Sequence, residues 1–204
     1  MRHSVGSAYL TAAVAYGWQD ITTDRSATAA GAALLHAQFD ANAWSARIEG
    51  GNRYLIPWFG GIGLTPYVAA QFTAFDLPDY AETDTAGSGV ALAYAAKTAI
   101  DTRSELGLRT DRSFAVNDAI LTLRGRAAWA HDYDTDRSVA ATFQSFVPAS
   151  FVVNGASPAH DAALTTASAE MKFSSAISVA ATFEGEFSDV TRSYAGKGVV
   201  RYDW

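Results

Sequence analysis

Charged side chains of both signs recur two residues apart in this sequence. Residues spaced in this way share one face of a β-strand, because successive side chains of a strand point to opposite faces. The residues concerned are Arg47, Glu49, Arg103, Glu105, Arg109, Arg124 and Arg126. On a common face they predict a hydrated surface of mixed charge, or cross-strand ion pairs that stabilise a sheet. Neither arrangement requires covalent chemistry.

The histidines and glycines offer little catalytic potential. His131 and Asp132 are adjacent, but they lie in an expected loop, where such residues are common. His3, His36 and His160 are scattered without metal-ligand spacing. There is no Gly-x-Ser-x-Gly sequence for a nucleophilic serine, and the glycine-rich stretches precede no helix that would bind a phosphate. We therefore expect no enzymatic activity, no metal and no cofactor.

Composition excludes several classes of protein. Hydrophobic residues make up 49 % of the 204 residues and charged residues 18 %, which is too apolar for a disordered chain. No apolar run approaches the ~20 residues of a membrane-spanning helix. The net charge of −6 argues against nucleic acid as a partner, and the absence of cysteine excludes a disulfide framework.

Alternation with a period of two residues extends along almost the whole chain and predicts an all-β protein. In the longest example, the even positions from Leu92 to Leu108 are mostly apolar or small, and the odd positions carry charges. The prolines fall between such segments or at their starts, where a strand tolerates a missing N–H. The expected strands are residues 7–20, 34–56, 62–76, 90–110, 117–131, 137–146, 149–156, 161–173, 176–188 and 192–204.

Three features favour an antiparallel, up-and-down transmembrane β-barrel over a soluble sheet protein. The segments are long enough to cross a bilayer, which takes ~9–11 residues of tilted strand. Aromatic residues lie near strand ends, as at membrane interfaces, among them Trp18, Trp129, Phe173 and Trp204. Short and long connections alternate along the chain, as they do in transmembrane barrels, and the expected number of strands is about ten. In this arrangement the charged face lines the lumen.

The C-terminal segment combines alternation with a terminal aromatic residue. Val200, Tyr202 and Trp204 share one face of the last expected strand. This ending resembles the signal that outer-membrane barrels present to the barrel assembly machinery.

Several ordered stretches together resemble the C-terminal translocator domain of an autotransporter, which belongs to type V secretion. They are Tyr9-Leu10-Thr11-Ala12-Ala13 with Tyr16-Gly17-Trp18, Arg47-Ile48-Glu49-Gly50-Gly51 with Arg53-Tyr54, Leu64-Thr65-Pro66-Tyr67, Glu105-Leu106-Gly107-Leu108-Arg109, Leu123-Arg124-Gly125-Arg126 through Trp129-Ala130-His131, and the closing Gly196-Lys197-Gly198 with Arg201-Tyr202-Asp203-Trp204. The resemblance implies an outer-membrane protein that anchors and exports a passenger polypeptide, with membrane lipid and the assembly machinery as further partners.

The resemblance also sets expectations about extent. The family's barrel has about twelve strands, against about ten expected here. By analogy, residues 1–204 form a partial barrel domain without the first strands, the pore helix, the passenger and an export signal. If these strands alone closed a barrel, Ala8–Gln19 would pair with the final strand.

Two other classes remain open at this stage. One is another outer-membrane barrel, either porin-like or a rim protease that uses His131 and Asp132. The other is a soluble all-β binding domain. Partition of the chain between detergent and buffer separates the second class from both kinds of barrel.

Overall fold

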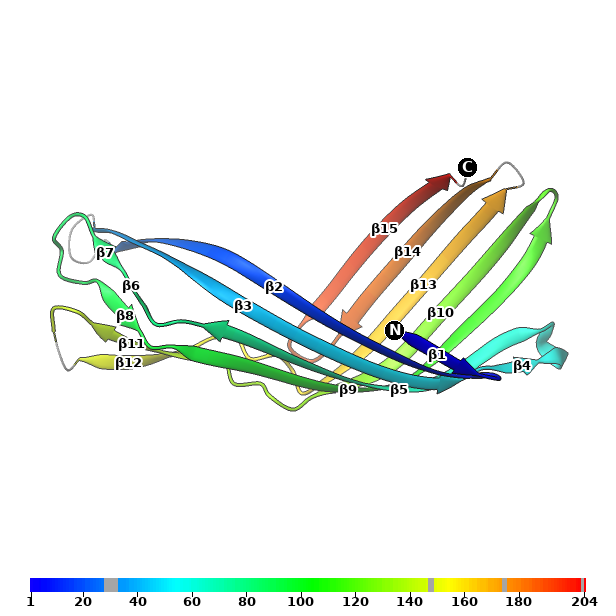
Figure 1. Ribbon diagram of the computed structural model, residues 1–204, viewed down its shortest axis with the longest axis horizontal. Coiled ribbons are helices and arrows are strands. Elements are labelled where there is room, and N and C mark those ends of the chain that lie inside the picture. Colours follow the sequence, from blue (N-terminus) through cyan, green and yellow to red (C-terminus); the bar gives the residue numbers. More distant parts are fainter. Residues whose placement is uncertain (28–32, 147–148, 174–175, 203) are drawn as a thin grey trace.

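The computed structural model describes residues 1–27, 33–146, 149–173, 176–202 and 204, most of which lie in antiparallel β-strands (Figure 1). The strands are β1 (Arg2–Val5), β2 (Ala8–Ala27), β3 (Ala33–Asn52), β4 (Tyr54–Ile56), β5 (Ile62–Leu77), β6 (Tyr80–Ala81), β7 (Thr83–Asp84), β8 (Leu92–Tyr94), β9 (Lys97–Val116), β10 (Ala119–Asp132), β11 (Ser138–Phe143), β12 (Ser150–Asn154), β13 (Asp161–Phe173), β14 (Ile177–Phe187) and β15 (Arg192–Tyr202). A 3-10 turn, η1 (Pro57–Phe59), joins β4 to β5. None of the described residues forms a helix of the length and apolarity needed to span a membrane.

The main sheet is an up-and-down meander in the order β1-β2-β3-β5-β9-β10-β13-β14-β15. Eight of these strands, all except β1, have between 11 and 20 residues in the described part of the chain, and we call them the wall. At ~3.3 Å per residue, even the shortest gives ~36 Å of strand, enough to cross a tilted apolar band of ~25 Å. The structure therefore confirms the all-β, antiparallel prediction.

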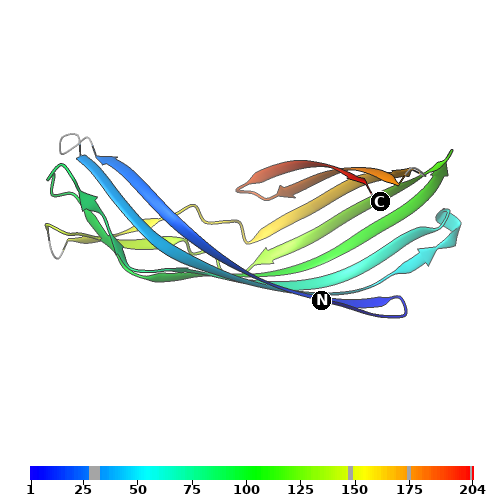
Figure 2. The same cartoon turned by 45° about the horizontal axis from the view of Figure 1, so that its top comes forward.

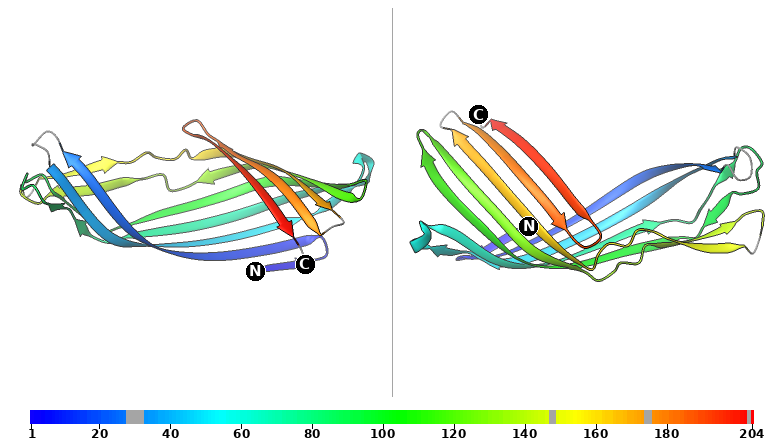
Figure 3. Two further views of the ribbon diagram at one scale, coloured as in Figure 1. Left: turned by 90° about the horizontal axis from the view of Figure 1, so that it is seen from above. Right: turned by 180° about the vertical axis from the view of Figure 1, so that it is seen from behind.

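The wall is curled along its length, and its two edges stay apart (Figures 2 and 3). Among the described residues, β15 pairs only with β14, whereas β2 pairs with β1 and β3. β1 covers only the first part of the β2 edge, from Ala8 to Thr11. The pairing of Ala8–Gln19 with the final strand, expected for a barrel closed by these strands alone, is not seen in this part of the chain.

A second, smaller sheet lies at one end of the wall, at the left of Figure 1, in the order β12-β11-β8-β6. We call it the rim sheet. Its neighbours are the far ends of β2 and β3, where Leu35 packs against Ala91 in a small apolar core. The rings of Phe39, Tyr80 and Tyr94 stack on this side, with centroid distances of 3.9 and 4.6 Å. The rim sheet is thus held by apolar packing together with polar contacts of the buried Glu82 carboxylate to Arg25 and the Leu92 N–H.

Burial in the wall is the reverse of that in a soluble protein. Glu105 and Glu49 are only 4 % and 8 % exposed, whereas large apolar side chains on the opposite face are open. The exposed apolar residues of the wall include Leu10, Val14, Trp44, Ile48, Val68, Phe72, Leu106, Leu123, Trp129, Val179, Phe183 and Val200. A sheet with an apolar outer face and a charged inner face matches a barrel surrounded by lipid. It does not match a soluble all-β domain.

The predicted strand segments all contain strands, but two of them have unexpected partners. Residues 137–146 and 149–156 contain β11 and β12, which pair with each other in the rim sheet, and β11 also pairs with β8. β10 pairs instead directly with β13, from Ala119–Phe173 to His131–Asp161. Alternation identifies a strand but not the strand it pairs with, so about ten expected wall strands become eight in the described residues.

Several strand ends also differ from the prediction. β9 continues to Val116, through the turn expected at 111–116, and the chain reverses at Asn117, whose φ of 52° is left-handed. The connections expected between 137–146 and 149–156 and between 161–173 and 176–188 fall on residues 147–148 and 174–175, outside the described residues. The two long connections, between β5 and β9 and between β10 and β13, lie at the rim-sheet end of the wall, whereas Asn117 and Asp118 alone join β9 to β10 at the other end.

Candidate functional site

The inner face of the wall gathers the predicted charged residues because the strands are in register. Glu49 is paired with Ala69, Ala69 with Glu105, and Glu105 with Ala130, so all four side chains point to the same face. Ala69 and Ala130 are small and buried beside Glu105. Their size leaves room for long side chains from neighbouring strands to reach the carboxylates.

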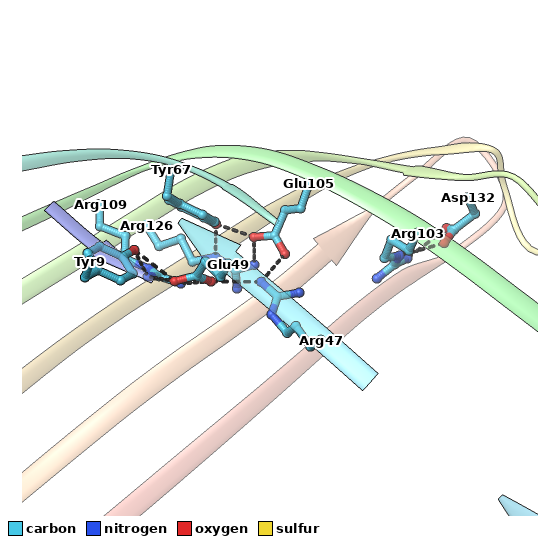
Figure 4. Close-up of polar contacts among 9 residues, drawn as sticks. All are labelled: Tyr9, Arg47, Glu49, Tyr67, Arg103, Glu105, Arg109, Arg126 and Asp132. Carbon is cyan, nitrogen blue, oxygen red and sulfur yellow. Dashed lines mark hydrogen bonds and ion pairs between the residues drawn. The ribbon is translucent and has the colours of Figure 1, made fainter. Parts of the chain in front are cut away.

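Glu105 on β9 is the centre of the first group of polar contacts (Figure 4). Arg47 Nη2 donates to Glu105 Oε2 at 2.8 Å. Arg126 and the Tyr67 hydroxyl donate to Oε1, and Arg126 Nε also donates to the Tyr67 hydroxyl at 2.6 Å. One carboxylate thus links side chains of β3, β5 and β10.

Glu49 on β3 is the centre of the second group. Arg109 donates from Nη1 and Nη2 to the two carboxylate oxygens, at 2.5 and 2.8 Å. The Tyr9 hydroxyl donates to Oε1 at 2.9 Å. Arg47 Nη2 reaches Oε2 at 3.0 Å and so joins the two groups.

Tyr67 occupies its central place because Gly107 has no side chain. A Cβ atom at Gly107 would lie 2.5 Å from the Tyr67 ring. On the same ring, Arg109 Cζ lies 4.1 Å from the centroid, within the range of a cation–π contact. The glycine inside β9 therefore serves a close approach on the inner face.

Arg103 forms a separate group toward the end of the wall with the long connections. It donates to both oxygens of Asp132, at 2.7 and 2.9 Å, and to Glu186 at 2.6 Å. Arg124 lies apart from both groups and pairs with Glu170 at 2.7 Å, where both side chains are more exposed. All seven predicted residues therefore lie on one face, but Arg103 and Arg124 do not join the central groups.

The inner face borders a hollow of about 560 Å³ that extends across the wall from β3 to β15. Arg47, Arg103, Arg109 and Arg126 are balanced there by Glu49, Glu105, Asp132 and Glu186. Charge is thus neutralised locally by paired groups. Such a surface is wetted by water and has no strong affinity for an ion of either sign.

Sequence reasoning missed Tyr9, Tyr67, Asp132, Glu170 and Glu186 as partners of the arginines. Their positions in the strands could have revealed them, since each falls on the same face as its partner once the register is known. The sequence predicts a loop at Asp132, but the residue ends β10, where it is buried and paired with Arg103. Its neighbour His131 contacts Asp161 at 2.9 Å instead, so the two do not form a catalytic pair.

A curled antiparallel wall with an apolar outer face and a charge-balanced inner face defines the class of transmembrane β-barrels. Among known families, the autotransporter beta-domain matches residues 1–184. No individual curated protein matches the chain. The chain belongs to the autotransporter beta-domain family, whose members are outer-membrane translocators with passenger export as their role. This match confirms the resemblance noted in the sequence.

Proposed function

We propose that this chain sits in the bacterial outer membrane and that its charged inner face lines a hydrated conduit for the passenger polypeptide. The observation that carries the proposal is the reversed burial of the wall, with Glu105 and Glu49 covered and Val68 and Leu106 open. A locally neutral lining offers an unfolded polar chain neither apolar surface to adhere to nor net charge to hold it. The partner on the outer face is lipid.

Cysteine labelling tests the two faces directly, because the chain has no cysteine of its own. Thr166 lines the inner hollow, and its neighbour Ala167 points to the opposite face. In outer membranes, a water-soluble maleimide should label Thr166→Cys and leave Ala167→Cys unlabelled. Equal labelling of the two variants would refute the proposed placement.

The same two variants test export. A bulky maleimide on Thr166→Cys narrows the conduit, whereas at Ala167→Cys the label would have to lie in lipid. We expect surface display of an epitope-tagged passenger, exported by the complete translocator that contains these residues, to stop only when the reagent modifies Thr166→Cys. Undiminished display from a fully labelled Thr166→Cys variant would show that the passenger takes another route.

We also propose that Val200, Tyr202 and Trp204 are read by the barrel assembly machinery. All three are exposed, and Val200 and Tyr202 lie on the outward face of β15, the edge strand. Trp204→Ala should reduce the folded, heat-modifiable fraction in outer membranes, whereas Trp204→Phe should preserve it. Wild-type assembly of Trp204→Ala would refute this role. Arg201→Ala, on the inward side of β15, serves as the control.

Residues 1–204, we propose, supply part of a barrel wall whose other strands, pore helix and passenger belong to the rest of an autotransporter. Support comes from the two unjoined edges, since unpaired N–H and C=O groups are costly in lipid. Gly196→Cys on β15 combined with cysteines along Ala12–Tyr16 of β2 tests this directly. A disulfide within one chain would show that these strands close the wall by themselves.

We propose, finally, that the domain has no catalytic activity of its own. The residues of the alternative rim-protease hypothesis are held in other contacts, Asp132 by Arg103 and His131 beside Asp161. His131→Ala should therefore leave passenger display and the size of the exported product unchanged. A change in product size would favour the protease.

A further inference from the structure

The outer face of the wall carries a cation that has no ionic partner among the described residues. Arg112 on β9 points outward, because its neighbours Asp111 and Ser113 lie on the same side as Arg109. None of the ion pairs in this part of the chain includes it. On a lipid-facing surface near an interface, such a charge calls for an anion.

The guanidinium of Arg112 is held in place by two neighbours. Its Cζ atom lies 4.4 Å from the centroid of the Phe114 ring. Gly60 also lies close by, with a φ of 70°, and a Cβ atom there would overlap Arg112 Nη2. The position belongs to the end of the wall with the short turns, four residues before the end of β9. Arg112 is therefore oriented by its surroundings without being neutralised by them.

A mainly apolar groove of about 440 Å³ starts at Arg112 and follows the seam between β9 and β10. Its outward side chains are Ile62, Thr110, Phe114 and Leu123, and Gly125 opens its floor. Asp111 and Arg124, whose side chains belong to the inner face, also border it. The seam continues past Leu108 and Ala127 to Leu106 and Trp129, which are paired in register. From Arg112 to Leu106 the strand covers ~20 Å, comparable to the ~15 Å depth of one leaflet.

We propose that this seam binds a phospholipid, with the phosphate at Arg112 and one acyl chain along the groove toward Trp129. A guanidinium matches a phosphate in charge and in geometry, because it can donate two parallel hydrogen bonds. The groove continues the apolar outer face, so the acyl chain lies where lipid already contacts the wall. The inference rests on the proposed membrane location and names one lipid-binding site within it.

The test uses the whole chain folded in detergent micelles and one defined probe, dipalmitoylphosphatidylglycerol. After gel filtration, native mass spectrometry counts the phospholipid that each chain retains. We expect one retained molecule for the wild type and about tenfold weaker retention for Arg112→Gln, the loss of a charge-assisted contact. Dipalmitoylglycerol, which lacks the phosphate, should bind as weakly to the wild type. Arg192→Gln, an exposed arginine at the other end of the wall, is the matched control.

A second pair of variants tests the groove separately from the charge. Ala127→Leu fills the seam and should also weaken retention, whereas Ala46→Leu, on the outer face of β3, should not. Equal retention by wild type and Arg112→Gln, or displacement of the lipid by millimolar inorganic phosphate, would overturn the proposal. Labelling of Thr166→Cys and Ala167→Cys in the same preparation reports independently which side of the wall faces the membrane. If this labelling pattern is as expected but no phospholipid is retained, the lipid site is refuted while the proposed function stands.

Discussion

The central part of the wall and the rim, by which we mean the rim sheet with the ends of β2 and β3 beside it, bury opposite kinds of side chain. Strand β3 runs through both regions. Along the inner face of β3, the wall presents Glu49 and Arg47, and the rim end presents Ala41, Ala37 and Leu35. The change occurs where the rim sheet begins to cover this face. At the rim-sheet end the side chains pack against protein, and in the wall they border the inner hollow.

The outer face of β3, in contrast, carries exposed apolar side chains in both regions. Ile48 in the wall and Leu34 at the rim end are both exposed apolar residues. In the proposed membrane placement, only Ile48 lies at the level where lipid surrounds the wall. The surroundings of a strand therefore decide which residues it can carry. Experiments that change one environment and leave the other intact test this view.

The largest effect should come from Glu105→Ala. This substitution removes the carboxylate shared by Arg47, Arg126 and Tyr67 and leaves two half-buried arginines without it. The free energy of unfolding should fall by about 4 kcal/mol, as for other broken buried pairs. Urea unfolding of the chain in phospholipid vesicles measures the loss, and amide hydrogen exchange at the rim should stay unchanged.

Glu170→Ala is the matched control on the same inner face. It breaks the more exposed pair with Arg124, which should cost about 0.5 kcal/mol. If both substitutions destabilise the wall equally, the central groups have no special structural role.

A smaller effect is expected from moving a charge to the outer face. Val68 in the wall is 58 % exposed and Leu34 at the rim is 64 % exposed, so solvent-accessible area alone predicts the same tolerance for lysine at both sites. Val68→Lys should cost about 3 kcal/mol because its surroundings are lipid. Leu34→Lys should cost less than about 0.5 kcal/mol. Equilibrium unfolding in vesicles separates the two outcomes, and equal tolerance would place the wall in water.

Gly107→Ala should have a still smaller effect, by crowding the inner face. The added methyl group meets the Tyr67 ring and pushes its hydroxyl away from Glu105 and Arg126. We expect a loss of about 2 kcal/mol, typical of overpacking. Gly198→Ala on β15 has open space around its Cβ and is the control. A difference of less than 0.5 kcal/mol between the two would show that Tyr67 adjusts freely.

The wall was predictable from sequence because its two faces meet different surroundings. Strands such as β10 and β13 alternate apolar and polar residues over their whole length, and the seven charged residues on one face follow from this period. Which charges meet was not predictable. Arg47 reaches Glu105 across β5, so their contact depends on the register of three strands.

The rim was harder to predict, for a related reason. Residues 20–27 are mostly polar and were expected to form a loop, yet they extend β2 and pair with residues 33–40 of β3. The proposed membrane placement leaves both faces of this segment outside the lipid, which accounts for the missing apolar period. β11 and β12 do show alternation, but a short apolar strand fits a wall and a rim sheet equally well.

The last and smallest prediction concerns acid and the rim alone. Burial would raise the pKa of the Glu82 carboxyl, but hydrogen bonds from Arg25 and from the Leu92 N–H outweigh it and lower this pKa. A carboxyl whose folded pKa is lowered stabilises the fold above its ordinary value of about 4.3, and this contribution is lost as the pH falls through the folded value. Hydrogen exchange at the Leu92 amide should therefore show weaker protection below about pH 4.3. Glu82→Gln keeps the shape without the titration, so its rim should be less stable at neutral pH and insensitive to acid. If acid lowers the hydrogen-exchange protection of the rim equally in wild type and in Glu82→Gln, another group controls the acid response.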